Sequence, residues 1–248
     1  FPDRVSPRNW WDLVEETRGA SPPYPDGHLY LSASRLAAYR DCPLKYKYAH
    51  HIALEDVAND AMSMGSLLHS VLEEYHRPGN SYERSSQTLQ QLLERFFDES
   101  KFSCAAIARQ VRRKASQLLD LYFPLYGWRG AALDVERYFR FRLDRLIITG
   151  KIDRIDQLQD GSLELIDYKT GSPMSQAEAM DDLQLALYEL AFHNDPRLAE
   201  LGLPSLVTYL YPKGISEKLA AKLAGNGGPP AKIPTKGDGK RSYLPTEK

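Results

Sequence analysis

The 248-residue sequence has few cysteines, no long apolar run and no large excess of charge of either sign. Its two cysteines, Cys42 and Cys104, are far apart, which argues against a disulfide framework or a zinc motif and favours a reducing cytoplasm. No apolar stretch reaches the roughly 18 residues that cross a membrane, and no signal peptide opens the chain. The formal net charge is −1, so any surface that binds a polyanion must be a local patch.

The sequence also lacks the glycine pattern of a P-loop, which argues against a nucleotidyl hydrolase of that kind. Its 42% hydrophobic and 26% charged residues are ordinary for a globular protein. The chain starts at Phe1, and its first residues are rich in proline, so we expect a piece of a longer protein. The expected parts are a linker over 1–29, a folded domain over 30–212 and a basic, Gly/Pro-rich, partly disordered tail over 213–248.

Hydrophobic periodicity predicts helices first, then a β-meander, then a further helix and strand. Capping residues indicate two helix starts, at Ser32 and Ser175. The expected helices begin near residue 32 and at Pro43 and then cover 60–76, 86–102, 104–123 and 175–193, and the expected strands cover 135–143, 146–158, 162–169 and 206–211. This order predicts an α/β domain with a mixed sheet flanked by helices.

The second and third of these strands form a hairpin that carries acidic residues. If residues 159–161 form a three-residue loop, Asp153 lies directly opposite Asp167, about 5 Å away on one face. Two carboxylates so placed repel each other unless a cation lies between them, and oxygen ligands suit Mg²⁺ or Mn²⁺. Lys169, on the same face, could orient a water or stabilise charge on a phosphate. A two-residue loop would instead put Asp153 opposite Tyr168, and the hairpin would then be a surface element with scattered ion pairs.

The helix expected over 60–76 carries Gly65, His69 and Glu73 four residues apart on the flank of its apolar stripe. Alone, His69 would be interpreted as a polar residue at the edge of a core. Beside two aspartates and a lysine, it is the better candidate for a metal ligand. Gly65 costs about 1 kcal/mol of helix propensity relative to Ala, which predicts that another segment approaches closely there.

Further polar residues could contact nucleic acid. Gln184 and Tyr188 lie one helical turn apart, and an amide and a phenol on one stripe can hold a phosphate or a base edge. A half-buried helix edge is the alternative. Basic side chains that could hold a phosphate backbone form two groups, of which the second could equally be a solvated helix face. The groups are Arg35, Arg40, Lys45 and Lys47, and Arg109, Arg112, Arg113 and Lys114.

Taken together, these residues resemble the RecB-like nucleases of the PD-(D/E)xK superfamily, from about residue 30 to residue 210. Each motif is weak alone, whereas the ordered set is specific. The set consists of Ser32-x-Ser34-x-Leu36-x-x-Tyr39-x-x-Cys42-Pro43-x-x-Tyr46, Gly65-x-x-x-His69-x-x-x-Glu73, Glu136, Gly150-x-x-Asp153-Arg154-x-Asp156, Asp167-x-Lys169-Thr170-Gly171 and Gln184-x-x-x-Tyr188.

The resemblance implies a restriction-endonuclease-like fold and hydrolysis of DNA phosphodiester bonds with Mg²⁺ or Mn²⁺, most simply as an exonuclease. The implied metal ligands are His69, Asp153, Asp167 and the carbonyl of Tyr168, and the implied catalytic lysine is Lys169. The implied DNA contacts are Gln184, Tyr188, Arg154 and Arg35, and the implied supporting acids are Glu73 and Glu136.

Some relatives hold an iron–sulfur cluster with a cysteine at the position of Cys42 and three later cysteines. No cysteine follows Cys104, so we expect no cluster in this chain and a small, buried Cys42. Many relatives form the end of UvrD-like helicases, which implies a helicase motor in cis or in complex and a role in DNA repair or recombination. The alternatives are a stand-alone exonuclease and an inactive DNA-binding module, although such modules usually lose the acids or the lysine that this sequence keeps.

Overall fold

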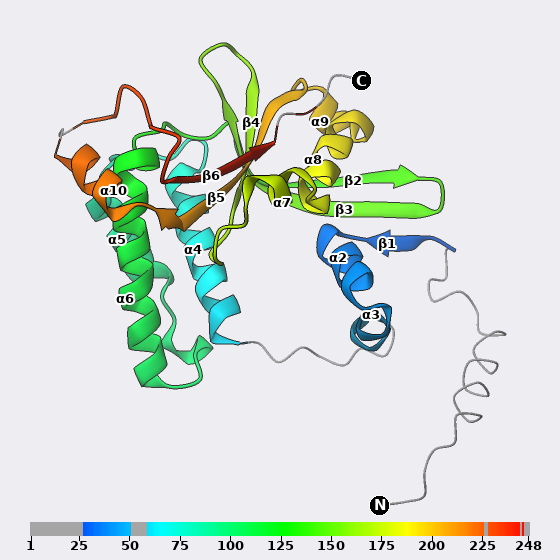
Figure 1. The fold of residues 1–248 in the computed structure, drawn as a ribbon, viewed down its shortest axis with the longest axis horizontal. Coiled ribbons are helices and arrows are strands. Elements are labelled where there is room, and N and C mark those ends of the chain that lie inside the picture. Colours follow the sequence, from blue (N-terminus) through cyan, green and yellow to red (C-terminus); the bar gives the residue numbers. More distant parts are fainter. Residues whose placement is uncertain (1–26, 51–58, 226–227, 244, 246–248) are drawn as a thin grey trace, which may run out of the picture.

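The structure, a computed structural model, describes residues 27–50, 59–225, 228–243 and 245. Most of the predicted linker lies outside these residues. Within them, six strands form one mixed sheet (Figure 1). The strands are β1 (Leu29–Leu31), β2 (Asp134–Leu143), β3 (Leu146–Gln157), β4 (Leu163–Tyr168), β5 (Pro204–Ile215) and β6 (Asp238–Tyr243).

The sheet is organised around β3. One edge of β3 pairs antiparallel with β2. Its other edge pairs parallel with β1 near the start of the strand and antiparallel with β4 near the end. From β4 the sheet continues through β5, which is parallel to β4, to β6, which is antiparallel to β5. The prediction of a mixed sheet flanked by helices is therefore confirmed.

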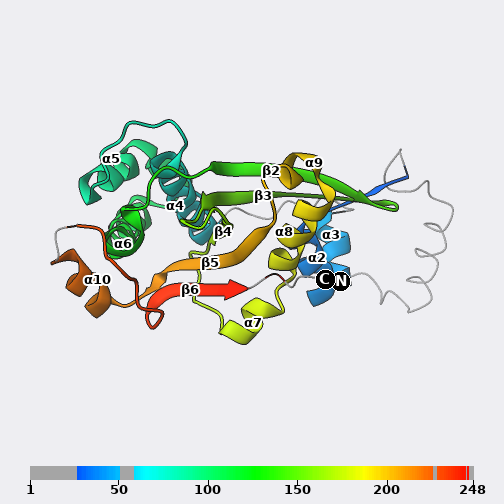
Figure 2. The same ribbon diagram turned by 90° about the horizontal axis from the view of Figure 1, so that it is seen from above.

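Helices cover both sides of the sheet, as Figures 1 and 2 show. One core lies between the sheet and α4, α5, α6 and α10, and a second lies between the sheet and α7, α8 and α9, with α2 packed against it. The helices of the described residues are α2 (Ala33–Asp41), α3 (Pro43–His50), α4 (Asp60–His76), α5 (Ser86–Phe96), α6 (Ala105–Tyr122), α7 (Gln176–Met180), α8 (Leu183–Asn194), α9 (Pro196–Ala199) and α10 (Glu217–Ala224), with a 3₁₀ turn η2 (Glu99–Lys101) and a π-helical turn η3 (Phe123–Gly127).

Two helix starts agree with the capping residues in the sequence. The side chain of Ser32 accepts a backbone hydrogen bond from the first turn of α2, and Ser175 forms a capping box at the start of α7. The single helix expected over 175–193 is two helices instead. Asp182 interrupts it, because its carboxylate accepts the backbone N–H of Gln184 and caps α8.

The segment over 213–248 differs from the predicted tail. Strand β5 continues to Ile215, and the helix α10 and the strand β6 follow it. Ala220 and Leu223 of α10 are buried in the core beside α6. Composition did not reveal these elements, because a short helix and an edge strand need few apolar residues when neighbours distant in sequence provide their packing.

A buried cluster of charges ties β6 to the centre of the sheet. Lys240 donates to Glu164 on β4, and Arg129 lies 2.7 Å from Glu164 and 3.1 Å from Asp156 on β3. Arg154 donates to both carboxylate oxygens of Asp156, at 2.6 and 2.7 Å. Burial alone would raise the pKa of Glu164, but Lys240 and Arg129 outweigh it and lower that pKa to about 2. Three cations thus surround the two carboxylates and favour the charged form of Glu164.

We predict that Lys240→Ala lowers the free energy of unfolding by about 2 to 3 kcal/mol, because it removes one partner from a buried carboxylate while Arg129 remains. Urea unfolding at pH 7 measures this change. Lys236→Ala is the matched control, since Lys236 is exposed in the same segment and a surface change usually stays within about 0.5 kcal/mol. Equally small effects of both substitutions would mean that the pair of Lys240 and Glu164 adds little to the stability of the domain.

Candidate active site

The two predicted aspartates meet across the β3–β4 hairpin. The pairing of these strands runs up to Arg154 opposite Ile166, and the same register continued by one residue places Asp153 opposite Asp167. The backbone N–H of Tyr168 donates to Asp153 Oδ2 at 2.8 Å, which fixes this carboxylate against β4. The predicted register is confirmed, so both carboxylates belong to one site.

Helix α4 brings His69 to the same place. His69 Nδ1 lies 3.3 Å from Asp153 Oδ2, and its ring meets the ring of Tyr168 edge-on with centroids 6.0 Å apart. The helix can lie this close because Gly65 faces the turn after β4. A Cβ atom on Gly65 would lie 3.3 Å from Thr170 Oγ1, tighter than an ordinary contact. The close approach predicted from Gly65 is therefore confirmed.

Asp167 is held in a fully buried position. Its Oδ1 lies 2.7 Å from the hydroxyl of Tyr188 and accepts a hydrogen bond of 2.6 Å from the amide of Gln184. Its Oδ2 accepts no hydrogen bond, although Lys169 Nζ lies 2.8 Å away as an ion-pair partner at a poor angle. Burial and the charge of Asp153 raise the pKa of Asp167 to about 6, against the lowering effect of Lys169.

Glu136 adds a third carboxylate. It lies on β2, and the residue pairs on either side of it in the β2–β3 register place it opposite Asp153. Its backbone is in the left-handed region at φ +52°, where non-glycine residues are uncommon and often functional. One ligand atom each from His69, Glu136 and Asp153 lies within 4.8 Å of the others. Lys151 pairs with Glu136, and Glu73 helps to line the hollow of about 520 Å³ around these groups.

The electrostatics of the site reflect an excess of carboxylate in a buried place. Burial would lower the pKa of His69, but its hydrogen bond to Asp153 and the charges of Asp153 and Asp167 outweigh that effect and raise the pKa. Both His69 and Asp167 thus bind protons more tightly than usual. A cation that displaces these protons would relieve the same repulsion.

The resemblance implied that Tyr188 lies along the DNA, whereas the structure buries most of this residue. Its side chain is only 3% exposed, and its hydroxyl lies 3.0 Å from the carbonyl of Lys151 as well as beside Asp167. Gln184 connects two functional groups, since its amide donates to Asp167 while its Oε1 accepts a 2.7 Å hydrogen bond from Lys169 Nζ. Tyr188 therefore holds Asp167 in place, and contacts of Tyr188 and the half-buried Gln184 with DNA stay predictions.

Arg154 also differs from its implied role in DNA binding. It is 1% exposed and is held by Asp156, on the opposite side of β3 from the site. The sequence contained the signal for this, because successive residues of a strand point to opposite faces and Asp153 faces the site. The predicted register also set Asp156 opposite Glu164, as observed. Two like charges so placed require cations beside them.

Of the other predicted basic residues, Arg40 lines a pocket that Lys169 and Gln184 also line. Arg35 is half-buried and donates to the carbonyl of Tyr30, and Arg112 on the exposed side of α6 pairs with Glu94 at 3.3 Å. Their contacts with DNA stay predictions. Cys42 is exposed rather than buried, because it caps the end of α2 at the bend toward α3.

Among the described helices, we find none that combines the length and the apolar character needed to cross a bilayer.

The fold and the site define a class of protein. The family model described as the PD-(D/E)XK nuclease superfamily matches residues 30–236, and the chain belongs to that superfamily. Among curated proteins, an ATP-dependent helicase/deoxyribonuclease subunit of Streptococcus uberis (strain ATCC BAA-854 / 0140J) is 30% identical over 165 residues, covering 59% of this chain and 14% of the relative. Its counterpart in Streptococcus pyogenes serotype M49 (strain NZ131) is 29% identical over 160 residues, covering 58% and 14%.

This chain thus corresponds to about 14% of the length of these relatives. A solved crystal structure of a protein from Eubacterium rectale superposes on 90% of this chain and 82% of its own, with 12% sequence identity and a TM-score of 0.44.

We predict that the contribution of Asp167 to stability in EDTA falls as pH rises from about 4 to about 6. In that range the folded state keeps a proton on Asp167 that the unfolded state, with an ordinary pKa near 4, has released. Because the folded state binds this additional proton, the part of the free energy of unfolding that comes from Asp167 decreases with pH. Asp167→Asn removes this titration, and its stability relative to the unsubstituted protein should rise over the same range in urea unfolding.

The matched control is Asp160→Asn in the turn of the same hairpin. Hydrogen bonds from Ser162 lower the pKa of Asp160, so the relative stability of this variant should not rise with pH. A difference between Asp167→Asn and the unsubstituted protein that is constant from pH 4 to pH 7 would contradict the raised pKa of Asp167.

Proposed function

We propose that this chain hydrolyses DNA phosphodiester bonds with the help of a divalent metal ion. The observation that carries the proposal is the convergence of His69, Glu136, Asp153 and Asp167 at the end of the β3–β4 hairpin, with Lys169 paired to Asp167. The family of the chain is a nuclease family, and its matched region includes all of these residues.

The side chains present fit a divalent cation. Carboxylate oxygens suit Mg²⁺ and Mn²⁺, and imidazole is tolerated by Mn²⁺. Asp167 Oδ2 is buried, accepts no hydrogen bond and has only the ion-pair contact of Lys169. His69, Asp153 and Asp167, joined by the carbonyl of Tyr168, would hold the ion, and Glu136 would support them. When bound, such an ion polarises the scissile phosphate and lowers the pKa of its water.

Lys169 and Tyr188 would have separate roles in the reaction. Lys169 is anchored at its backbone by the carbonyl of Leu210 on β5, at 2.9 Å, and its ammonium is held by Asp167 and Gln184. In this position it would orient the attacking water and stabilise negative charge that develops on the phosphate. Tyr188 keeps Asp167 in place through its hydroxyl. Lys169 would therefore act mainly on the transition state rather than on binding.

The direct test is degradation of end-labelled single- and double-stranded DNA with Mg²⁺, Mn²⁺ or EDTA. Products that shorten from one end would establish an exonuclease, and internal fragments an endonuclease. Cleavage that persists in EDTA, or the absence of cleavage with either metal, would sink the proposal.

We predict that Lys169→Ala reduces cleavage by at least about 100-fold, while folding and DNA affinity change little, because loss of a group that acts in the transition state lowers turnover more than binding. Single-turnover cleavage and fluorescence anisotropy measure the two effects separately. Lys213→Ala, which changes an exposed lysine of β5, is the matched control. An equal loss of turnover and affinity in Lys169→Ala would identify Lys169 as a phosphate anchor instead.

We further propose that the chain works with a helicase motor, in cis or in complex, in DNA repair or recombination. The support is its similarity to proteins named as subunits of an ATP-dependent helicase/deoxyribonuclease, of which it spans about 14%. A net charge of −1 gives the chain no strong electrostatic attraction to DNA of its own. A tethered motor would raise the local concentration of DNA at the site.

On that basis we predict that the 248-residue chain alone degrades linear DNA slowly, with little sequence preference. Attachment to the motor together with ATP should accelerate degradation by at least about 10-fold through the higher effective concentration. Rates on a linear plasmid with and without the motor make the comparison, and a non-hydrolysable ATP analogue is the control. Equal rates for the chain alone and the motor-linked protein, or cutting at one defined sequence, would contradict it.

A further inference from the structure

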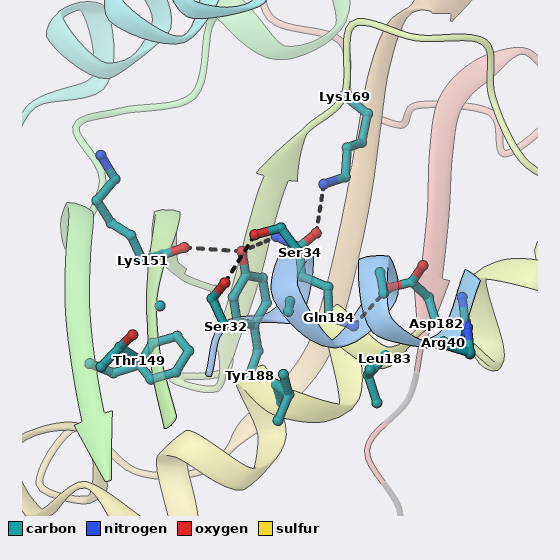
Figure 3. A pocket seen from close by; sticks show the side chains of 15 residues that line it. Ser32, Ser34, Arg40, Thr149, Lys151, Lys169, Asp182, Leu183, Gln184 and Tyr188 are labelled. Carbon is teal, nitrogen blue, oxygen red and sulfur yellow. Dashed lines mark hydrogen bonds between the residues drawn. The ribbon is translucent and has the colours of Figure 1, made fainter. Parts of the chain in front are cut away.

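A second pocket adjoins the site on the side of α2 and α8. It has a volume of about 400 Å³, and Lys169, Gln184 and Tyr188 help to line it, as Figure 3 shows. It is distinct from the hollow at His69, Glu136 and Asp153, and Lys151 is the residue that lines both. The pocket thus begins where the catalytic lysine lies and extends away from the carboxylates.

The walls of this pocket are apolar on two opposing helices. Ala33 and Ala37 of α2 line one side, and Leu183 and Leu187 of α8 line the other. Both alanines are small, which keeps the space open. The wall on the strands is formed in part by the ring of Phe139, which covers β3 at Gly150 so closely that a Cβ atom there would lie 2.3 Å from the ring.

Polar groups lie around these apolar walls. Ser32 and Ser34 share a 2.9 Å hydrogen bond at the start of α2, and Thr149, Asp182 and Gln184 lie around the same space. The set includes hydroxyl groups that donate and accept and a carboxylate acceptor, whereas the Gln184 amide is already engaged by Asp167 and Lys169. Such a mixture suits the edge of a flat heterocycle with both donors and acceptors.

We propose that this pocket binds one unpaired base of the DNA strand whose phosphate lies at Asp167 and Lys169. The inference rests on the function proposed above and specifies which part of the substrate the second pocket would bind. Pockets that read single bases combine apolar or aromatic side chains against the ring faces with hydrogen bonds to the ring edge. A volume of about 400 Å³ lies within the range of small-ligand sites.

A second phosphate fits this pocket poorly. The carboxylate of Asp182 lines it and would repel a phosphate. Of the cations that line the pocket, Lys169 is engaged by Asp167 and Gln184, and Lys151 is paired with Glu136. The third, Arg40, has a 63% exposed side chain beside Asp41. The backbone N–H of Gln184, in the first turn of α8, is taken by the Asp182 side chain. A base is therefore the part of a nucleotide that matches these walls.

The geometry has a consequence for the substrate. A base in a duplex is stacked and paired, and it enters a side pocket of this kind only if it is extruded, which costs a few kcal/mol. A base in a single strand or at a frayed end has no such cost. The pocket therefore favours cleavage where the strand is locally unpaired, whichever base is present.

The test places a single abasic residue at successive positions of an end-labelled oligo(dT) strand and measures the rate at every bond. Base stacking of about 1–3 kcal/mol corresponds to a roughly 5- to 150-fold effect. With the unsubstituted protein, one bond at a fixed offset from the abasic residue should slow by an amount in this range. Ala37→Trp fills the pocket, so its rates should be lower but should no longer depend on the abasic residue. Ala38→Trp, on the same helix outside the pocket lining, should keep the original pattern.

Binding in EDTA separates this inference from the proposed function. Fluorescence anisotropy should show oligo(dT) bound at least about 5-fold more tightly than a fully abasic strand of equal length, with the difference lost in Ala37→Trp and kept in Ala38→Trp. Ser34→Phe enters the pocket from an exposed position and replaces Ala37→Trp if that variant fails to fold. Absence of cleavage with any metal would overturn the proposed function while the binding result still decides the pocket. The inference would be overturned if the missing base changed neither the cleavage rates nor the affinity of the unsubstituted protein. It would also be overturned if a variant with a filled pocket still distinguished abasic DNA from oligo(dT).

Discussion

The β3–β4 hairpin brings Asp153 and Asp167 together in a largely buried place, and elements on both sides of the sheet hold these two carboxylates despite their repulsion. Asp153 is held by the backbone of β4, and Asp167 by Tyr188 and Gln184 from α8. The single cation in direct contact with Asp167 among the described residues is Lys169. Two carboxylates with so little compensation favour either protons or a metal ion. Burial and the charge of Asp153 raise the pKa of Asp167. A bound divalent cation would offset the repulsion between the two carboxylates.

On the opposite side of the same two strands, a second pair of carboxylates is compensated by cationic side chains of the protein. Asp156 and Glu164 are directly opposite each other in the register that also brings the catalytic pair together. There, Arg154, Arg129 and Lys240 neutralise them, and no cation from outside is needed. One strand pairing thus creates two carboxylate pairs, one satisfied by side chains and one left for a ligand. Since Lys240 comes from β6, the end of the chain takes part in holding the hairpin.

Helices α4 and α8, on two sides of the site, position different groups. Helix α4 can deliver His69 because Gly65 lets it approach the turn after β4. Helix α8 positions Asp167 and Lys169 and, with α2, encloses the second pocket. The small side chains of α2 leave space where larger ones would close it. The carboxylates of the candidate site and the second pocket therefore meet at Lys169, which pairs with Asp167 and lines the pocket.

Much of the fold and of the catalytic set could be predicted from local pattern. Strand alternation, the Asp160-Gly161 turn and the caps at Ser32 and Ser175 identified the hairpin, its register and two helix starts, because each depends on interactions between residues a few positions apart. The roles of Arg154 and Tyr188, the exposure of Cys42 and the order in α10 and β6 were not predicted. The contacts that bury a long side chain, and the packing of a short polar segment onto the core, depend on residues many positions away in the sequence. By itself, the sequence determined which groups the hairpin presents. Only the tertiary structure decided which of them are buried with several counter-charges and which have little charge compensation, since burial and charge compensation come from elements that the chain brings together on folding.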